Sequence, residues 1–243
     1  MSNAYRTKNS TGLINKNKKI NFSFNGHTYH GYEGDTLASA LISNGIHLIG
    51  RSFKYHRPRG FLGVGVEEPN AMVQLHEGNK SEPNIIATEV ELVEGLKAKS
   101  QNCWPSVQFD IGEVNNLLNR FFPAGFYYKT FMWPKSFWMK IYEPFIRKAA
   151  GMGVAPLQPD PDRYEHNYEH CDVLVVGSGP SGLASALAAA KNGARVILAE
   201  DKANFGGSLL TDEVTIGNMS GKEWANDTVA QLKSLPNVLL KKR

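Results

Sequence analysis

Residues 171–201 read CDVLVVGSGPSGLASALAAAKNGARVILAED, and this stretch decides the fold of the second half of the chain. The apolar run 173–176 predicts a buried strand, and the alanine-rich run 181–191 predicts a helix that ends at Asn192-Gly193. A second strand is expected at 195–199. A strand, a glycine-rich loop, a helix and a second strand in this order predict an α/β unit of the Rossmann type.

The loop between the first strand and the helix carries the pattern G-x-G-x-x-G. Gly177 permits a tight turn, Gly179 lets the backbone approach a pyrophosphate, and Gly182 lets the helix pack close to the strand. Glu200, at the end of the second strand, offers a carboxylate to ribose hydroxyls. The pattern predicts dinucleotide binding, with the helix N-terminus facing the phosphates. The alternative is that the glycines serve only a close crossing of helix and strand.

A second glycine pair follows in the run NFGGS at 204–208, which is expected to approach the same nucleotide. Asp201 and Lys202 fit either a nucleotide contact or a solvated loop. No residue is a convincing catalytic acid, base or nucleophile, and no metal site is expected. The predicted cofactor-binding residues are Gly177, Ser178, Gly179, Pro180, Ser181, Gly182, Glu200, Asp201, Lys202, Gly207 and Ser208.

The first half of the chain predicts a small α+β unit. Asn25-Gly26 stands between two alternating runs and predicts a hairpin, because both turn positions need positive φ. Asp35 is expected to cap a helix over 36–44, and strands are expected at 71–75 and 85–93. The predicted organisation is a flexible tail at 1–18, an α+β domain at 19–100, an aromatic-rich connector at 101–170 with one helix near 135–149, and the start of the Rossmann domain at 171–243.

Composition narrows the class of protein. The formal charge of +4 is spread through the chain, so no nucleic-acid partner is expected. No apolar stretch is long enough to span a membrane, and no signal peptide is visible. The two cysteines, Cys103 and Cys171, are too few for a disulfide framework or a four-thiolate metal site, which suits a reducing cytoplasm.

One local excess of positive charge lies between residues 51 and 59. We interpret it as a basic face that packs against acidic residues such as Glu67 and Glu68 or against a partner subunit. Phosphate binding is the alternative. The basic residues are Arg51, Lys54, His56, Arg57 and Arg59.

The chain resembles the alpha subunits of heterotetrameric sarcosine oxidases from about residue 20 to its end. The segments that carry the resemblance are GDTLASALISNGIHLIGRSFKYHRPRG at 34–60, EEPNAMVQL at 67–75, AGFYYKTFMWP at 124–134, YEPFIRKAAG at 142–151 and the glycine-rich stretch. The aromatic segment is specific, because no generic fold requires it.

The resemblance implies a ferredoxin-like β-grasp domain followed by a pyridine-nucleotide domain. It further implies a cytoplasmic oxidoreductase complex with beta, gamma and delta type subunits, which oxidatively demethylates sarcosine to glycine with O2 and tetrahydrofolate. NAD is expected in this chain, bound through Ser181, Glu200, Asp201, Lys202 and Ser208, with FAD and FMN elsewhere in the complex. Related proteins with a [2Fe-2S] cluster have several cysteines after KYHRPRG, whereas this chain reads FLGVGVEEPN, so a cluster-free domain is expected.

Two expectations concern the limits of the chain. After Glu200 the sequence offers one helix at 222–232 and one strand start at 238–240, so the Rossmann domain looks truncated and the chain alone is expected to be inactive. The alternatives in function are a subunit of a related amine, opine or glycine dehydrogenase, or a non-catalytic nucleotide-binding scaffold.

Overall fold

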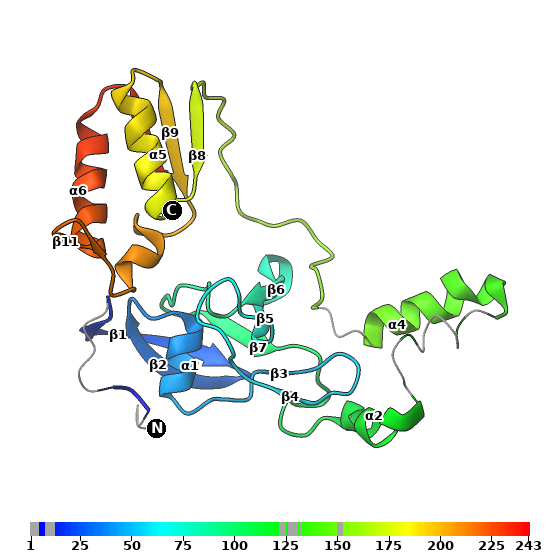
Figure 1. Ribbon diagram of the computed structural model, residues 1–243. Helices are drawn as coiled ribbons and strands as arrows, with labels where there is room; N and C mark the ends of the chain where they lie inside the picture. Colours follow the sequence, from blue (N-terminus) through cyan, green and yellow to red (C-terminus); the bar gives the residue numbers. More distant parts are fainter. Residues whose placement is uncertain (1–4, 8–12, 122–124, 126–130, 132, 150–152) are drawn as a thin grey trace. The chain divides into compact units, whose positions relative to one another are not determined.

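The computed structural model describes residues 5–7, 13–121, 125, 131, 133–149 and 153–243. The chain divides into two compact units, of which the first comprises mainly residues 14–163 and the second mainly 164–243. Figure 1 draws both units.

The first unit begins with the hairpin that the Asn-Gly pair predicts. Strands β1 (Asn15–Phe24) and β2 (His27–Glu33) pair antiparallel. The two turn residues, Asn25 and Gly26, have φ of 51° and 80°, the positive values that a two-residue turn of this kind requires. Because β1 starts at Asn15, the predicted tail extends too far: residues 15–18 are part of a strand.

Five strands form the sheet of this unit, in the order β2-β1-β7-β5-β6. The β1 and β7 strands run parallel, and the other neighbouring pairs run antiparallel. The strand predicted over 85–93 is shorter than expected and begins earlier, while β7 was not predicted. Besides β1 and β2, this sheet contains β5 (Met72–Leu75), β6 (Glu82–Ile86) and β7 (Lys97–Ser100). A separate two-stranded ladder joins β3 (Gly50–Arg51) to β4 (Pro58–Arg59).

Helix α1 (Leu37–Ser43) is capped by Thr36, not by Asp35 as predicted. The Thr36 hydroxyl accepts a hydrogen bond from the backbone N–H of Ser39, and the Ser39 hydroxyl bonds back to the Thr36 N–H. Asp35 is instead a buried anchor: its carboxylate accepts from the backbone of Tyr32 at 2.8 Å and pairs with Arg6 at 2.6 Å. Arg6 is therefore tied to the domain, within the segment predicted as a tail.

The core of this unit lies between α1 and the sheet. Phe22, Phe24, Leu37 and Leu41 are all at most 2% exposed. The alternation of the hairpin strands places the two phenylalanines on one face, where the helix covers them. The core therefore follows directly from the period-two pattern of β1 and the helical spacing in α1.

The segment that follows the sheet contains only short helical pieces among its described residues. Large apolar side chains of this segment stay exposed, including those of Leu117 and Trp133, each at 82%. The helix expected near 135–149 is present as a 3-10 turn, a π-helical turn and an α-helix; the resemblance segment at 124–134 lies largely outside the described residues. The pieces are η2 (Ile111–Glu113), α2 (Val114–Leu117), η3 (Asn119–Phe121), η4 (Lys135–Phe137), η5 (Trp138–Tyr142) and α4 (Glu143–Ala149). A further 3-10 turn, η1 (Gly78–Lys80), lies earlier in the chain, between β5 and β6.

The second unit is a parallel three-stranded sheet in the order β12-β9-β8, with α5 and α6 on one face (Figure 1). Leu183 of α5 and Leu232 of α6 are fully buried between the helices and the sheet. The elements are β8 (Val173–Val176), α5 (Pro180–Lys191), β9 (Val196–Glu200), η6 (Gly207–Leu210), β10 (Thr215–Ile216), β11 (Met219–Ser220), α6 (Gly221–Ser234) and β12 (Val238–Lys242).

The other face of this sheet is only partly covered. Leu174 and Val176 of β8 are 59% and 80% exposed, and Leu239 of β12 is 44% exposed. Buried parallel strands usually have apolar residues on both faces, and the sequence of β8 meets that pattern although only one face is covered here. In the part of the chain that the structure describes, no helix is both long and apolar enough to cross a membrane.

Candidate dinucleotide-binding site

The glycine loop joins β8 to α5 as the sequence pattern predicts. Gly177 has a φ of 91°, a value in the left-handed region that glycine adopts without strain. A Cβ added to Gly182 would lie 2.0 Å from the Gly177 carbonyl oxygen, so only glycine fits at that crossing. The close approach of α5 to β8 therefore depends on this one residue.

Gly179 differs from these two glycines because neither its backbone angle nor a neighbouring atom among the described residues requires a glycine there. Its φ is −63°, which any residue adopts, and a Cβ added to it would meet no atom within 4 Å. The space beside Gly179 is open, as expected if a ligand approaches the backbone there. The helix then begins at Pro180 with no side-chain cap, so the N–H groups of its first turn, Ser181 and Gly182 among them, face outward without an intrahelical acceptor.

Glu200 lies at the end of β9, directly beside the glycine loop. One carboxylate oxygen accepts hydrogen bonds from both the backbone N–H of Ser178, at 2.8 Å, and the Ser178 hydroxyl. The other accepts from the N–H of Lys202 at 3.1 Å. Burial opposes ionisation of this carboxyl, but the Ser178 and Lys202 hydrogen bonds outweigh burial and hold the pKa of Glu200 below its usual range.

Asp201 follows Glu200 in the chain, and the two carboxyl groups interact through a hydrogen bond. Its hydrogen bond to the Glu200 carboxylate, with burial adding to the effect, raises the pKa of Asp201. Glu200 is therefore the charged acceptor of the pair, which is the state needed to accept hydrogen bonds from ribose hydroxyls. Asp201 itself is exposed and stands outside the loop.

Ser178 connects the separate segments of the site and has no exposed surface. Besides its bonds to Glu200, its hydroxyl accepts from the backbone N–H of Gly206 at 3.1 Å. This side chain therefore points into the protein and holds Glu200 and Gly206 in place. The G-x-G-x-x-G pattern does not indicate such a role, because the residue between its first two glycines is variable.

The second glycine pair packs against the first loop. A Cβ on Gly207 would lie 2.9 Å from the Gly179 Cα, and both Gly206 and Gly207 have positive φ. Ser208, in the first turn of η6, is exposed, as is Ser181. The structure thus gathers the predicted segments 177–182, 200–202 and 207–208 into one region of the second unit.

Other candidate sites among the described residues are weaker. No group of three or more His, Cys, Asp or Glu side chains is placed to hold a metal ion in the described ranges. The predicted pairing of the basic cluster with Glu67 and Glu68 is wrong, since both carboxylates bind backbone N–H groups of their own loop. Arg51 instead pairs with Glu113 at 3.1 Å.

Comparison with protein families agrees with this division of the chain. Residues 17–103 match the family described as a 2Fe-2S iron-sulfur cluster binding domain, and residues 172–233 match the family described as FAD dependent oxidoreductase. The first unit is thus similar to a ferredoxin-type domain, and the second is similar to part of an FAD-dependent oxidoreductase.

Two curated relatives specify the class further. The chain is 56% identical over 93% of its length to the sarcosine oxidase subunit alpha of Rhizobium meliloti (strain 1021), covering 23% of that protein. It is 32% identical over 90% of its length to the same subunit of Corynebacterium sp. (strain U-96), covering 18%. The chain is a homologue of sarcosine oxidase alpha subunits, as its sequence predicted, and it spans about a quarter or less of their length.

The family matches correct the cofactor prediction. The prediction of a domain without an iron-sulfur cluster is contradicted by the match of residues 17–103 to a cluster-binding family. The match of residues 172–233 names FAD, whereas the sequence predicted NAD in this chain.

Such a cluster needs more thiols than the matched segment contains. A [2Fe-2S] group takes four cysteine ligands, or two cysteines and two histidines, and residues 17–103 contain a single cysteine, Cys103. Burial raises the pKa of the Cys103 thiol, which disfavours the thiolate form that binds iron. The thiols of this chain do not fit the group.

Proposed function

We propose that the glycine loop after β8 binds the adenosine diphosphate part of FAD, in an oxidoreductase of the sarcosine oxidase type. The observation that carries the proposal is the open space beside Gly179, next to an uncapped helix N-terminus and the Glu200 carboxylate. A purely structural glycine would be required by a neighbour or by its φ, as Gly182 and Gly177 are. Gly179 is required by neither.

Each segment has a distinct part in binding. The N–H groups of Ser181 and Gly182 would donate to the pyrophosphate, which the partial positive charge of the α5 N-terminus also attracts. Glu200, held ionised by Ser178, would accept from the ribose hydroxyls. Lys202, Gly207 and Ser208 border the same loop, and Pro180 supplies the fixed φ of the first helical position.

When bound, the flavin would accept a hydride equivalent, that is two electrons and one proton, from the carbon next to an amine nitrogen. The residues described in this chain bind and orient the nucleotide end, and none of them is a candidate to transfer a proton to or from substrate. We therefore assign substrate oxidation to the assembled protein rather than to the segment described here.

The proposed substrate is sarcosine, demethylated to glycine with O2 and tetrahydrofolate, in a complex with beta, gamma and delta type subunits. The homology to subunits of sarcosine oxidase supports this proposal. The exposed apolar side chains of the segment 104–157, among them Leu117, Trp133 and Phe145, offer the kind of surface that a partner subunit covers.

Titration of the 243-residue chain with FAD, followed by flavin fluorescence, tests the nucleotide assignment. We expect saturable one-to-one binding that Gly179→Val abolishes, while Ala188→Val, a matched enlargement on the exposed face of α5, leaves it unchanged. Equal FAD affinity in the wild-type and a folded Gly179→Val protein would refute the assignment.

A second measurement separates an enzyme subunit from a nucleotide-binding scaffold. The chain is co-purified with its partner subunits, and sarcosine-dependent oxygen consumption is compared between wild type and Gly179→Val. Loss of turnover is expected. A complex that assembles but never oxidises sarcosine would instead support the scaffold.

A further inference from the structure

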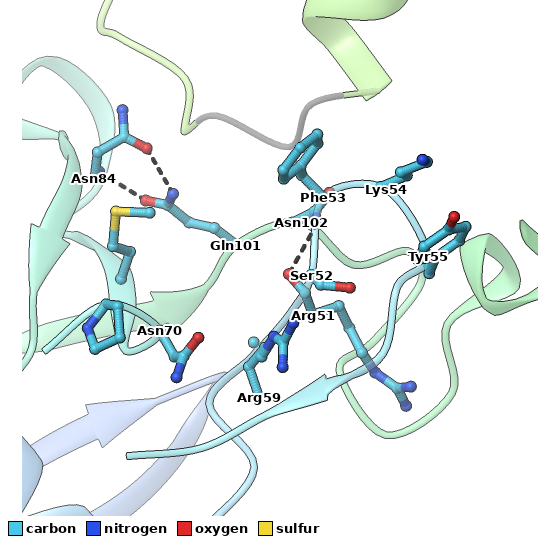
Figure 2. A pocket seen from close by; sticks show the side chains of 13 residues that line it. Arg51, Ser52, Phe53, Lys54, Tyr55, Arg59, Asn70, Asn84, Gln101 and Asn102 are labelled. Carbon is cyan, nitrogen blue, oxygen red and sulfur yellow. Dashed lines mark hydrogen bonds between the residues drawn. The ribbon is translucent and has the colours of Figure 1, made fainter. Parts of the chain in front are cut away.

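The ferredoxin-type unit contains a pocket that the proposed function does not use (Figure 2). Its volume is about 560 Å³, within the range of small-molecule sites. It lies where β3 and the loop after it, β4, the start of β5, β6 and the residues just after β7 meet. The lining includes three cationic side chains, those of Arg51, Lys54 and Arg59, and no carboxylate.

Arg59 is the cation of this lining whose charge no described residue satisfies. Its backbone is fixed in the β3–β4 ladder opposite Gly50, and its carbonyl accepts from the N–H of Ile49 at 2.9 Å. Its guanidinium makes no hydrogen bond or ion pair with any described residue. Because Gly50 has no side chain, nothing on the opposing strand position occupies the space beside Arg59.

Arg51 shows what a structural arginine looks like in the same pocket. Its side chain is 4% exposed and donates to the carbonyl oxygens of Val107, at 2.8 Å, and His56, at 3.1 Å, besides its ion pair with Glu113. The Arg51 guanidinium is thus already paired with groups of the protein. Arg59 on the neighbouring strand is available for a ligand.

The walls of the pocket are amide side chains held in place by hydrogen bonds. Asn84 and Gln101 bond to each other, side chain to side chain, at 2.8 Å. Asn102, at a φ of 53°, donates to the Arg51 carbonyl at 2.9 Å (Figure 2). The side chain of Asn70 makes no hydrogen bond with the described residues and remains available to donate and accept.

An aromatic side chain completes the lining. Phe53 lines the pocket but is 66% exposed, so its ring is not used by the core. The ring of Tyr55 lies under two cations, Lys54 and Arg57, each 4.8 Å from the ring centre. Phe53 is therefore the ring free to stack on a ligand.

We propose that this pocket binds a phosphate monoester attached to a planar ring, of the size of a nucleoside monophosphate. The Arg59 guanidinium has the planar fork that pairs with two phosphate oxygens. Phe53 provides a stacking surface, and Asn70 provides an amide for the polar edge of the ring. The absence of any carboxylate from the lining favours an anion over a cation.

Uridine monophosphate is a suitable probe, because its base differs from the adenine that the proposed FAD site would bind. Binding to the 243-residue chain is measured by isothermal titration calorimetry. We expect saturable binding that Arg59→Gln weakens at least tenfold and Phe53→Leu about threefold. Uridine and inorganic phosphate should each bind more weakly than the intact nucleotide. Gly179→Val, which disrupts the FAD site, should retain the binding, so the two proposals fail independently.

Arg57→Gln is the matched control, since it removes the same charge from the same basic run but from outside the pocket lining. It should change the affinity less than twofold. The proposal is overturned if uridine monophosphate does not bind, if Arg57→Gln weakens binding as much as Arg59→Gln, or if inorganic phosphate binds as tightly as the nucleotide.

Discussion

The same substitution at Gly179 and at Gly182 should affect the stability of the second unit differently. In Gly182→Ala the new Cβ would lie 2.0 Å from the Gly177 carbonyl oxygen. A carbon and an oxygen approach no closer than about 3.3 Å, so helix and loop must separate by about 1.3 Å. Overpacking of this kind costs about 1–3 kcal/mol. The expected result is a lower urea midpoint for unfolding of the second unit, with FAD affinity reduced in parallel.

Gly179→Ala should leave stability unchanged, because its Cβ enters open space at an ordinary φ. If the Gly179 backbone approaches the pyrophosphate, the methyl group displaces the ligand and weakens a charge-assisted hydrogen bond worth about 1.5–3 kcal/mol. FAD affinity should then fall about tenfold to hundredfold. Urea unfolding and fluorescence titration on the same preparations measure both quantities. Unchanged affinity in Gly179→Ala, or unchanged stability in Gly182→Ala, would refute the reasoning.

Three further substitutions test the fold and its charges. Leu183→Ala removes a fully buried side chain between α5 and the sheet and should cost about 2–5 kcal/mol in the free energy of unfolding, measured with urea. Arg6→Ala leaves the buried Asp35 carboxylate without its cation, and a loss of about 3 kcal/mol is expected; a change below 0.5 kcal/mol would show that the ion pair does not anchor residue 6. The Arg195 guanidinium lowers the pKa of Asp172 to about 2. The ionised carboxylate therefore stabilises the fold above pH 4, and this contribution is lost as the pH falls toward 2. In Asp172→Asn that part of the acid unfolding transition should be absent from a pH titration followed by circular dichroism.

The sequence predicted best where local pattern and backbone geometry coincide. The Asn25-Gly26 turn and the loop from Gly177 to Gly182 were recognised because glycine and asparagine at those positions have few other uses. Strand β7 was missed since its sequence, KAKS, has no apolar run, and its place between β1 and β5 is fixed by tertiary pairing. Propensity carries no information about such pairing.

Side-chain roles within the predicted segments were harder to predict. Asp35 fits the pattern of a helix cap, yet a distant residue, Arg6, draws it into a buried ion pair and leaves the cap to Thr36. Ser178 was grouped with the nucleotide contacts, whereas its side chain is buried. The pocket beside Arg59 was also beyond prediction, because its lining comes from five separated stretches of sequence.

The buried hydroxyl of Ser178 has a consequence for the energetics of ligand capture. By joining Glu200 to Gly206, it connects three segments of the site before any nucleotide arrives. A preorganised site of this kind loses little conformational entropy on binding, so more of the contact energy remains as affinity. Replacing Ser178 should therefore make nucleotide binding entropically less favourable, although its side chain is buried within the protein.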